Sequence, residues 1–422
     1  MGFTFLTGAA GTGKTFTIKK QIQRDPMYAI ITATTGIAAI NIGGITLNSL
    51  LGFYNYEDLY YKYKDKQITD RLRKIKDRGY LGVVIDEASM LGSNTLDILY
   101  NCFEEVNYHS GYEFHLTLVG DLLQLPPIKE DCIIKAQSWK YFKFKLLTDI
   151  KRQTDIDFIT CLNQVRLGNP EPAAEYLAKQ NVFCNYIDKN FLGTTLFSTN
   201  KEVDEYNKFR LDLLNTKEQT YTSKIEGLAS PDWKNIPQTI TLKEGALVML
   251  LANSYEQNNY VDCGGETDYF LNSSIRYANG DLGICKHLSQ TGVIVELLRN
   301  KQQVLVQPII RKYENFSNSK KRVLGRITYL PVKVAYGSTL HKSQGLTLDR
   351  VQININSNFL SKIQGALYVA LSRVRTTDGL RIIGNPEQFK RRCVVNKDIV
   401  NFYNSLQDGS MTVESACSFL LR

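Results

Sequence analysis

Metal-ligand spacings are missing from this chain of 422 residues. It contains four histidines and eight widely scattered cysteines, and no two cysteines form a C-x-x-C pair. Zinc and iron–sulfur sites depend on such spacings, so the sequence argues against both kinds of site. Reduced thiols are therefore expected, as in most intracellular proteins.

Long apolar runs are also missing, since no stretch of 18 residues is continuously apolar, which argues against a membrane span. No signal peptide is expected, because residues 3–6 lead straight into a glycine-rich loop and should belong to the fold. A cytoplasmic location in a bacterium or virus, or a nuclear one, follows. The net charge of +9 permits a polyanionic partner without specifying one.

The length and composition indicate a multidomain protein. At about 150 residues per domain, the chain should form two or three domains. Hydrophobic residues make up 43% of the sequence, which is enough for a sizeable core.

The first 23 residues have the pattern of a phosphate-binding loop. An apolar strand at residues 3–7 precedes a G-x-x-x-x-G-K-T loop, and residues 16–23 are predicted to be helical. The alternative, a glycine-rich turn with a surface lysine, does not account for this order of strand, loop and helix. Lys14 should contact the β- and γ-phosphates, and Thr15 should bind Mg²⁺. The predicted nucleotide-binding residues of this loop are Gly8, Ala9, Ala10, Gly11, Thr12, Gly13, Lys14 and Thr15.

Polar residues follow two further predicted strands. Asp86 and Glu87 follow the apolar run at residues 81–85, and Gln124 follows the strand at 115–119. Open α/β sheets bind ligands at the carboxyl ends of their strands. Asp86 is therefore predicted to hold Mg²⁺, Glu87 to orient or deprotonate a water molecule, and Gln124 to reach a γ-phosphate.

Two features permit more than one interpretation. Residues 52–80 interleave tyrosines with lysines and arginines, which suits stacking on nucleic-acid bases but equally an amphipathic segment with a solvated face. Arg152 lies near the end of the first predicted domain. Taken alone it is a surface cation or a phosphate ligand.

The second half of the chain begins as another α/β unit. Helices are predicted over residues 158–189, and residues 194–200 open a second α/β unit with a helix that starts at residue 201. Short strands at close spacing then indicate a small β-barrel at 246–327. Strand-then-helix patterns resume at residue 331, and the apolar segment 364–373 is predicted to be a helix that ends at Arg373.

These motifs, in this order and spacing, resemble those of superfamily 1B DNA helicases, and within them the Pif-like (petite integration frequency) group with its RecD-like relatives. The resemblance runs from residue 3 to residue 383, and its most specific parts are HKSQGLTLDRV and YVALSRVR. The full set of matching stretches is GAAGTGKT, ATTGIAAINIGGITLNSLLGF, VVIDEASM, GDLLQLPPI, DIKRQTD, FSTNKEVDEYN, HKSQGLTLDRVQI and YVALSRVRTTDGLRI.

The resemblance implies an α/β fold of two RecA-like parallel-sheet domains with a small inserted Src-homology-3-like β-barrel. The first domain would span 1–152 and include the Tyr/Lys-rich excursion at 52–80. The second would comprise 153–245 and 328–422, and the barrel 246–327. ATP would bind with Mg²⁺ between the two RecA-like domains.

The resemblance also assigns roles to individual residues. Gln344, with Gly345 beside it, and Gln124 would contact the nucleotide, while Arg152 and Arg373 would reach across the cleft as arginine fingers. For His341, the alternative to a contact with the DNA strand is a histidine that caps a helix or is buried in the fold. The single-strand contacts would be Thr35, Gly36, Asn48, Thr339 and His341. Phosphate contacts of this kind hold a strand without reading its sequence.

Two departures from the family pattern stand out. The glutamine-containing segment that usually precedes the first strand and recognises adenine is missing from this sequence, which leaves nucleotide choice open. Asn48 stands where relatives usually have histidine; its amide still donates hydrogen bonds, so a weakened contact is expected.

The function implied is an ATP-dependent helicase that moves on single-stranded DNA, from 5′ to 3′ by family resemblance. Single-stranded and tailed duplex DNA are the expected partners, with replication or repair proteins as further ones, and the expected state is a monomer. The main alternative is a DNA-stimulated translocase subunit that does not unwind by itself. A P-loop kinase of a small metabolite and a protein that binds ATP without hydrolysing it are further alternatives.

Overall fold

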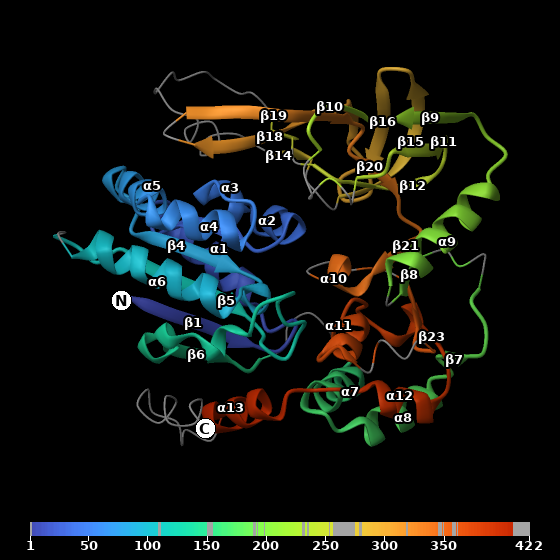
Figure 1. Cartoon of the computed structure of the whole chain (residues 1–422). Helices are drawn as coiled ribbons and strands as arrows, with labels where there is room; N and C mark the ends of the chain where they lie inside the picture. Colours follow the sequence, from blue (N-terminus) through green and yellow to red (C-terminus); the bar gives the residue numbers. More distant parts are fainter. Residues whose placement is uncertain are drawn as a thin grey trace. The chain divides into compact units, whose positions relative to one another are not determined.

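The computed structural model describes most of the chain (Figure 1). The described residues are 2–108, 111–149, 155–188, 191, 193–197, 199–229, 233, 236–252, 254–255, 275–277, 281–317, 320–344, 348, 350–356, 360 and 362–407. Two compact units are present: residues 1–198 together with 339–422 form the first, and residues 199–338 form the second. Within the described residues, no helix has both the length and the apolar character needed to cross a bilayer.

The N-terminal lobe of the first unit is a six-stranded parallel sheet with the strand order β3-β2-β4-β5-β1-β6. Its strands are β1 (Phe3–Gly8), β2 (Ile30–Ala33), β3 (Ile45–Thr46), β4 (Gly82–Asp86), β5 (His115–Gly120) and β6 (Lys143–Leu147). Its helices are α1 (Lys14–Arg24), α2 (Gly36–Ile42), α3 (Leu47–Leu51), α4 (Tyr56–Lys64), α5 (Gln67–Asp77) and α6 (Ser93–Asn107). The central strands β4 and β5 are buried along their whole length, which explains their nearly continuous apolar sequences.

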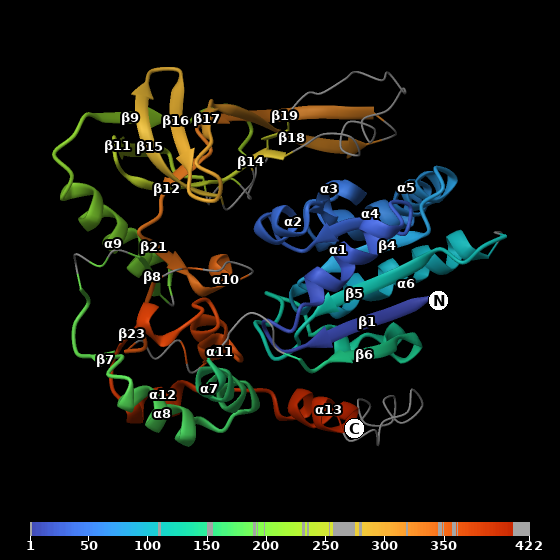
Figure 2. The same cartoon turned by 180° about the vertical axis from the view of Figure 1, so that it is seen from behind.

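The C-terminal lobe of the first unit contains a second parallel sheet, in which the strand order is β8-β22-β23-β7. Its elements are α7 (Ile156–Leu167), α8 (Pro170–Lys179), β7 (Phe183–Cys184), β8 (Thr194–Phe197), α10 (Leu340–Ser343), β22 (Val351–Asn354), α11 (Ala366–Leu371), β23 (Leu380–Ile383), α12 (Pro386–Arg392) and α13 (Lys397–Gln407). Helices α7, α8 and α12 lie together (Figures 1 and 2), and their apolar faces share one core with β22 and β23.

The last described helix returns to the N-terminal lobe. Figures 1 and 2 both place α13 beside β6. Phe402 of α13 lies 5.3 Å from Phe144 and 6.2 Å from Trp139, measured between ring centroids. The C-terminal segment therefore contributes to the core of the first sheet.

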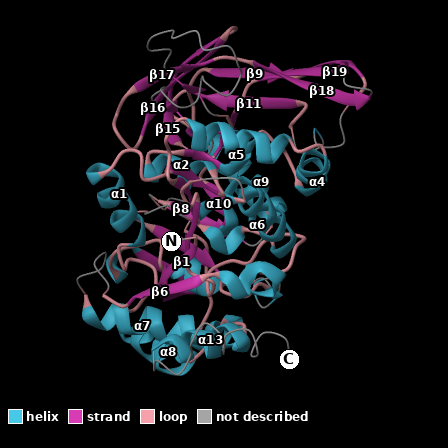
Figure 3. Ribbon diagram, turned by 90° about the vertical axis from the view of Figure 1, so that its left-hand side faces the viewer, coloured by secondary structure: helices cyan, strands magenta, loops and turns pink. Residues whose placement is uncertain are grey.

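The second unit is rich in antiparallel strands (Figure 3). Strands β12, β15, β16, β17 and β20 form a five-stranded sheet in the order β17-β16-β15-β12-β20, and β18 and β19 form a long hairpin that pairs with β10. The elements are α9 (Asn200–Asp212), β9 (Glu218–Thr222), β10 (Lys224–Gly227), β11 (Thr239–Lys243), β12 (Leu247–Leu250), β13 (Ser254–Tyr255), β14 (Ile275–Tyr277), β15 (Leu282–Ser289), β16 (Gly292–Leu297), β17 (Gln303–Val306), β18 (Ile309–Ser317), β19 (Lys320–Tyr329) and β20 (Val332–Val334), followed by β21 (Gly337–Thr339), where the chain returns to the first unit.

The limits of this unit differ from those expected for the inserted barrel. The compact unit begins at Thr199, because α9 and strands β9 to β11 group with the later strands, and it ends at Ser338. The two parallel lobes, by contrast, group together. The three-part division at residues 152, 245 and 327 therefore stays a proposal.

Candidate active site

The loop between β1 and α1 has the backbone conformation of an anion-binding turn. Gly13, the residue before α1, has φ of 84°, a left-handed value that side chains disfavour. At Gly8 a Cβ atom would lie 2.4 Å from the carbonyl oxygen of Leu147, so only glycine fits. No side chain caps the start of α1. Its first N–H groups, with the positive end of the helix dipole, are therefore available to a phosphate.

Lys14 lies folded back over this loop. Its Nζ atom donates hydrogen bonds to the carbonyl oxygens of Gly8, at 2.8 Å, and Ala9, at 2.9 Å. Burial lowers the pKa of the Lys14 amine, although nearby carboxylates oppose this shift. A partly buried ammonium group beside a turn of N–H groups suits a polyphosphate, which would supply the opposite charge.

Asp86 ends β4 next to the start of α1. Thr15 Oγ1 donates to Asp86 Oδ2 at 2.9 Å, and the backbone N–H of Glu87 donates to Asp86 Oδ1 at 2.9 Å. Burial, and then the neighbouring Glu87, raise the pKa of Asp86 to about 6. A buried carboxylate held against a hydroxyl group is a set of oxygen donors that suits Mg²⁺, and the ion would relieve the charge repulsion. Thr15 and Asp86 therefore fit the predicted metal role.

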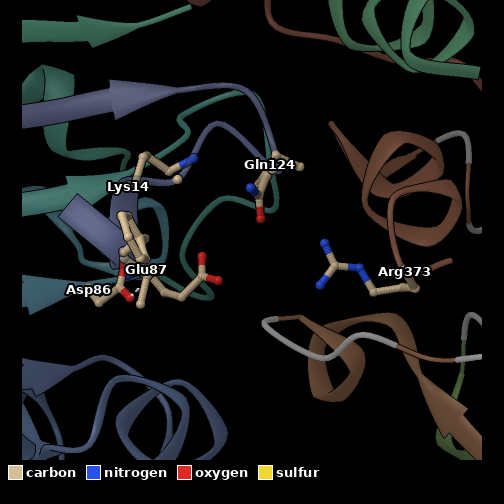
Figure 4. A pocket seen from close by; sticks show the side chains of 10 residues that line it. Lys14, Asp86, Glu87, Gln124 and Arg373 are labelled. Atoms are coloured by element: carbon tan, nitrogen blue, oxygen red, sulfur yellow. Dashed lines mark hydrogen bonds between the residues drawn. The ribbon is translucent and has the colours of Figure 1, made fainter. Parts of the chain in front are cut away.

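Glu87 has an uncommon backbone conformation. Its φ of 53° is in the left-handed region, which costs a residue other than glycine about 1–3 kcal/mol. The turn is held by Thr34, whose Oγ1 donates to the Glu87 carbonyl oxygen at 2.9 Å. The carboxylate is thereby directed into the cavity beside Lys14 (Figure 4).

The opposite wall of this cavity comes from the C-terminal lobe. The cavity has a volume of about 470 Å³, and Arg373 lines it together with Lys14, Glu87 and Gln124. Figure 4 shows the Arg373 guanidinium facing the space into which Glu87 and Gln124 project. One lobe therefore contributes the loop, the lysine and the acids, and the other contributes an arginine.

The Arg373 side chain is held by its own lobe. It is 2% exposed, and its Nε atom donates to the carbonyl oxygen of Val369 at 2.8 Å. Nη1 donates to the carbonyl oxygen of Ser343 at 3.3 Å, and Nη2 to Ser372 Oγ at 2.8 Å. These contacts fix the direction of the guanidinium before any substrate is bound.

Two glutamines complete the inner wall. Gln344 Nε2 donates to Glu87 Oε2 at 3.3 Å and to Ser89 Oγ at 3.2 Å. The Oε1 atoms of Gln124 and Gln344 are buried and have no hydrogen-bond partner within the described part of the protein. Such orphaned acceptors are uncommon, and a donor from a bound water or ligand would satisfy them.

Three predicted site residues lie wholly or partly outside the described residues. Arg152 and Gly345 lie outside the described residues, and for His341 the structure describes the backbone of α10 but not the side chain. The roles predicted for them stay predictions.

Known helicases resemble this chain in sequence and in fold. The profile of the PIF1-like helicase family matches residues 1–176. The ATP-dependent DNA helicase Pif1 of Bdellovibrio bacteriovorus is 29% identical over 96% of this chain and 88% of its own length. The PIF1 helicase of Danio rerio is 30% identical over 98% of this chain and 63% of its own. The crystal structure of Bacteroides Pif1 in complex with ADP-AlF3 and ssDNA gives a TM-score of 0.74 at 26% identity, covering 96% of this chain and 94% of that one.

The chain is therefore similar to Pif1-like helicases over nearly its whole length. The predicted α/β fold with two RecA-like parallel-sheet domains is thereby confirmed.

The predicted strand-contacting residues lie at the ends of strands or on short helices. Thr35 precedes α2, where its Oγ1 accepts from the N–H of Ala38 at 3.2 Å, and Gly36 begins that helix. Asn48 lies in α3, and Thr339 ends β21. Contact of these residues with DNA stays a prediction.

The Tyr/Lys-rich excursion folds as α4 and α5, and both helices are amphipathic. Leu59, Ile68 and Leu72 are fully buried on their inner faces. Tyr61 is nevertheless 69% exposed, and Tyr60 is 40% exposed with Lys64 Nζ 5.3 Å from its ring centroid. The amphipathic interpretation explains the inner face, and the exposed tyrosines keep the stacking interpretation open.

Replacing Tyr60 and Tyr61 with alanine tests that interpretation. If bases stack on these rings, single-strand affinity should fall by ~1–3 kcal/mol per stack lost. Fluorescence anisotropy with a labelled oligonucleotide measures the effect, and Tyr186→Ala, which removes an exposed tyrosine from the other lobe, is the control. Equal affinities for the double variant and the parent protein would assign the segment a purely structural role.

Phe16 and three buried residues, Asp121, Arg166 and Tyr368, had no role predicted from the sequence. Phe16 lines the cavity although 63% of its surface is exposed. Asp121 and Tyr368 lie within the matching stretches GDLLQLPPI and YVALSRVR, but had no assigned role, and Arg166 lies in none of them. The sequence did point to Asp121 and Tyr368, because each stands within five residues of a predicted site residue.

Proposed function

We propose that this protein is an ATP-dependent DNA helicase that translocates on single-stranded DNA, in the 5′ to 3′ direction that the family resemblance implies. The observation that carries the proposal is the shared cavity, in which Arg373 of one lobe faces Lys14 and Glu87 of the other. Supporting it are the relatives named as ATP-dependent DNA helicases and the Bacteroides protein crystallised with ADP-AlF3 and ssDNA.

Different residues of the site would carry out different tasks in ATP hydrolysis. The loop amides and Lys14 would hold the phosphates, and Glu87 would orient and deprotonate the attacking water. Arg373 and the amides of Gln124 and Gln344 would stabilise the charge that develops on the γ-phosphate. Mg²⁺, held by Thr15 and Asp86, would neutralise charge on the phosphate oxygens.

Coupling to DNA follows from the two-lobed site. A substrate bound by both walls draws the lobes together, and its hydrolysis removes the shared contacts. Each lobe would hold the strand through backbone contacts near Thr35, Gly36 and Thr339. Each cycle of hydrolysis would then change the affinity of one lobe for the strand relative to that of the other. Opening a base pair costs on average ~1.4 kcal/mol per stacking step, which one ATP can supply.

Strand separation on tailed duplexes tests the proposal. With ATP and Mg²⁺, a duplex with a 5′ single-stranded tail should be unwound, and a blunt duplex should not. Unwinding only of the 3′-tailed duplex would reverse the proposed direction. ATP turnover without strand separation would favour the alternative of a translocase subunit within a recombination or repair complex.

DNA affinity should fall steeply with salt. A groove that holds the strand through its phosphates releases counterions on binding, with a log–log slope of about −0.7 per phosphate contacted on single strands. Anisotropy titrations at several salt concentrations give this slope. A flat dependence would contradict backbone-tracking contacts, and affinities that depend on base sequence at one salt concentration would indicate sequence readout.

The cellular setting follows from the same proposal. A DNA-dependent motor belongs where DNA is replicated, recombined or repaired, in a bacterial or viral setting or in a nucleus. We propose a monomer that meets replication or repair proteins on DNA.

A further inference from the structure

A buried carboxylate lies between the two lobes of the first unit. Asp121, next to the end of β5, is fully buried, and Arg166 of α7 donates to it twice, from Nε at 3.0 Å and from Nη2 at 2.9 Å. Burial alone would raise the pKa of Asp121, but the Arg166 guanidinium outweighs burial and the pKa is lowered. Asp121 is therefore an anion at neutral pH, held by a cation from the other lobe.

One tyrosine hydroxyl connects this ion pair to the phosphate-binding loop, and the ring of a second tyrosine packs against Arg166. Tyr368 of α11 donates to Asp121 Oδ2 at 3.2 Å, and its oxygen accepts from the N–H of Ala10 at 2.7 Å. Tyr403 of α13 accepts from the N–H of Leu122 at 2.9 Å, and its hydroxyl lies 2.5 Å from Thr7 Oγ1. Both tyrosines belong to the C-terminal lobe or to α13, whereas Ala10 lines the cavity and Thr7 lies in β1 just before the loop.

The helix that carries Tyr368 also leads to the arginine of the site. Helix α11 has six residues, and Arg373 follows its end by two positions. At the start of α11, a Cβ atom on Gly365 would lie 2.4 Å from the carbonyl oxygen of Leu123, so this helix packs directly on the segment that bears Gln124. The Tyr368 hydroxyl and the Arg373 guanidinium thus extend from one short segment, the first to the phosphate-binding loop at Ala10 and the second to the cavity that Ala10 also lines.

A purely structural role would explain a satisfied, buried polar cluster. It does not explain why the Tyr368 hydroxyl accepts from Ala10, since the phosphate-binding loop is the part of the site that must contact substrate. A movement of this loop on binding ATP would act directly on α11 through that hydrogen bond.

We propose that Tyr368 is a positioning residue for ATP hydrolysis. Its hydroxyl, held by Asp121, which Arg166 holds in turn, fixes α11 to the phosphate-binding loop and so sets the placement of Arg373 against the substrate. This inference rests on the proposed function. It goes further because it assigns to Asp121, Arg166 and Tyr368 the mechanical link between the two walls of the cavity.

Tyr368→Phe removes the hydroxyl and keeps the ring. We expect kcat to fall roughly tenfold, the effect of one hydrogen bond that matters in the transition state, while KM for ATP changes less than about twofold. Tyr176→Phe is the matched control. The Tyr176 hydroxyl also donates to a carboxylate, but its partner is Asp155 of the same lobe, at 3.3 Å. An unchanged kcat in Tyr368→Phe would overturn the proposal.

A double-mutant cycle with Arg373→Lys separates positioning from structural damage. If Tyr368 acts through Arg373, adding Tyr368→Phe to Arg373→Lys should lower kcat by less than about twofold. The same tenfold loss in both backgrounds would overturn the proposal. Parent protein that shows no ATP turnover would instead refute the proposed function, so the two failures are distinguishable.

Arg166→Lys provides a second route to the same test if the tyrosine variant does not fold. It keeps a cation beside Asp121 but loses the two-pronged contact. The loss of kcat that Arg166→Lys causes should be smaller in the Arg373→Lys background than in the parent protein. Urea unfolding confirms that each variant is folded. Equal losses in both backgrounds would overturn the proposal here as well.

Discussion

Arg373→Ala is expected to lower kcat for ATP hydrolysis by roughly 10³–10⁵, the effect of an arginine finger in nucleotide hydrolases. The guanidinium faces the cavity and would stabilise charge that grows only as the phosphate transfers. Steady-state hydrolysis measures the loss. ATP affinity, measured separately with a fluorescent analogue, should change much less.

Arg375→Ala is the control for this prediction. Arg375 lies two residues further along the chain and is exposed, so its removal should leave hydrolysis unchanged. Because removing Arg373 deprives the carbonyl oxygens of Val369 and Ser343 of a donor, urea unfolding must show that the variant remains folded. Equal losses in the two variants would contradict the assigned role, as would full activity of Arg373→Ala.

Lys14→Ala is expected to abolish ATP turnover while leaving single-strand binding largely intact. The Lys14 amine lies over the phosphate-binding loop and would stabilise the transferring phosphate, and it has no assigned part in holding DNA. Hydrolysis assays and anisotropy titrations on the same preparation check the two halves of the prediction.

Lys20→Ala serves as the comparison for Lys14→Ala, because Lys20 is an exposed cation on the same helix. It should retain hydrolysis. Normal turnover in Lys14→Ala would remove the basis for placing the γ-phosphate at this loop. Loss of both activities together would indicate that the loop supports the fold rather than the chemistry.

The side of the site that belongs to the N-terminal lobe could be predicted from the sequence because its signals are local. Strand, loop and helix follow one another within 24 residues, and Asp86 and Glu87 stand where an apolar strand ends. Parallel strands bring their carboxyl ends to one edge, so these separate segments necessarily converge. The predicted helix at 16–23 differs from α1 only at its ends.

The link between the lobes could not be predicted in the same way. Arg166 is 45 residues from Asp121, and Tyr368 is 358 residues from Ala10. No periodicity or turn signal in a sequence specifies which buried tyrosine hydroxyl meets which backbone N–H. Placement of Arg373 in the cavity was accessible only through family resemblance, because an arginine after an apolar helix has no distinctive local pattern.

The limits of the inserted unit illustrate a further difficulty. Helix α9 follows β8 as it would in a continuing α/β unit, but it groups with the β-rich unit. Leu211 of α9 packs in the same core as Val248 and Val295. Assignment of a helix to one unit or another depends on which core receives its apolar face, and the pattern of that face is the same in both cases.

ATP hydrolysis by the intact chain, with and without single-stranded DNA, tests most directly whether this two-walled site drives a DNA motor. We predict Mg²⁺-dependent hydrolysis whose kcat rises strongly when single-stranded DNA is added. Hydrolysis at the same rate in the absence and presence of DNA, or turnover that requires a small phosphate acceptor, would contradict it.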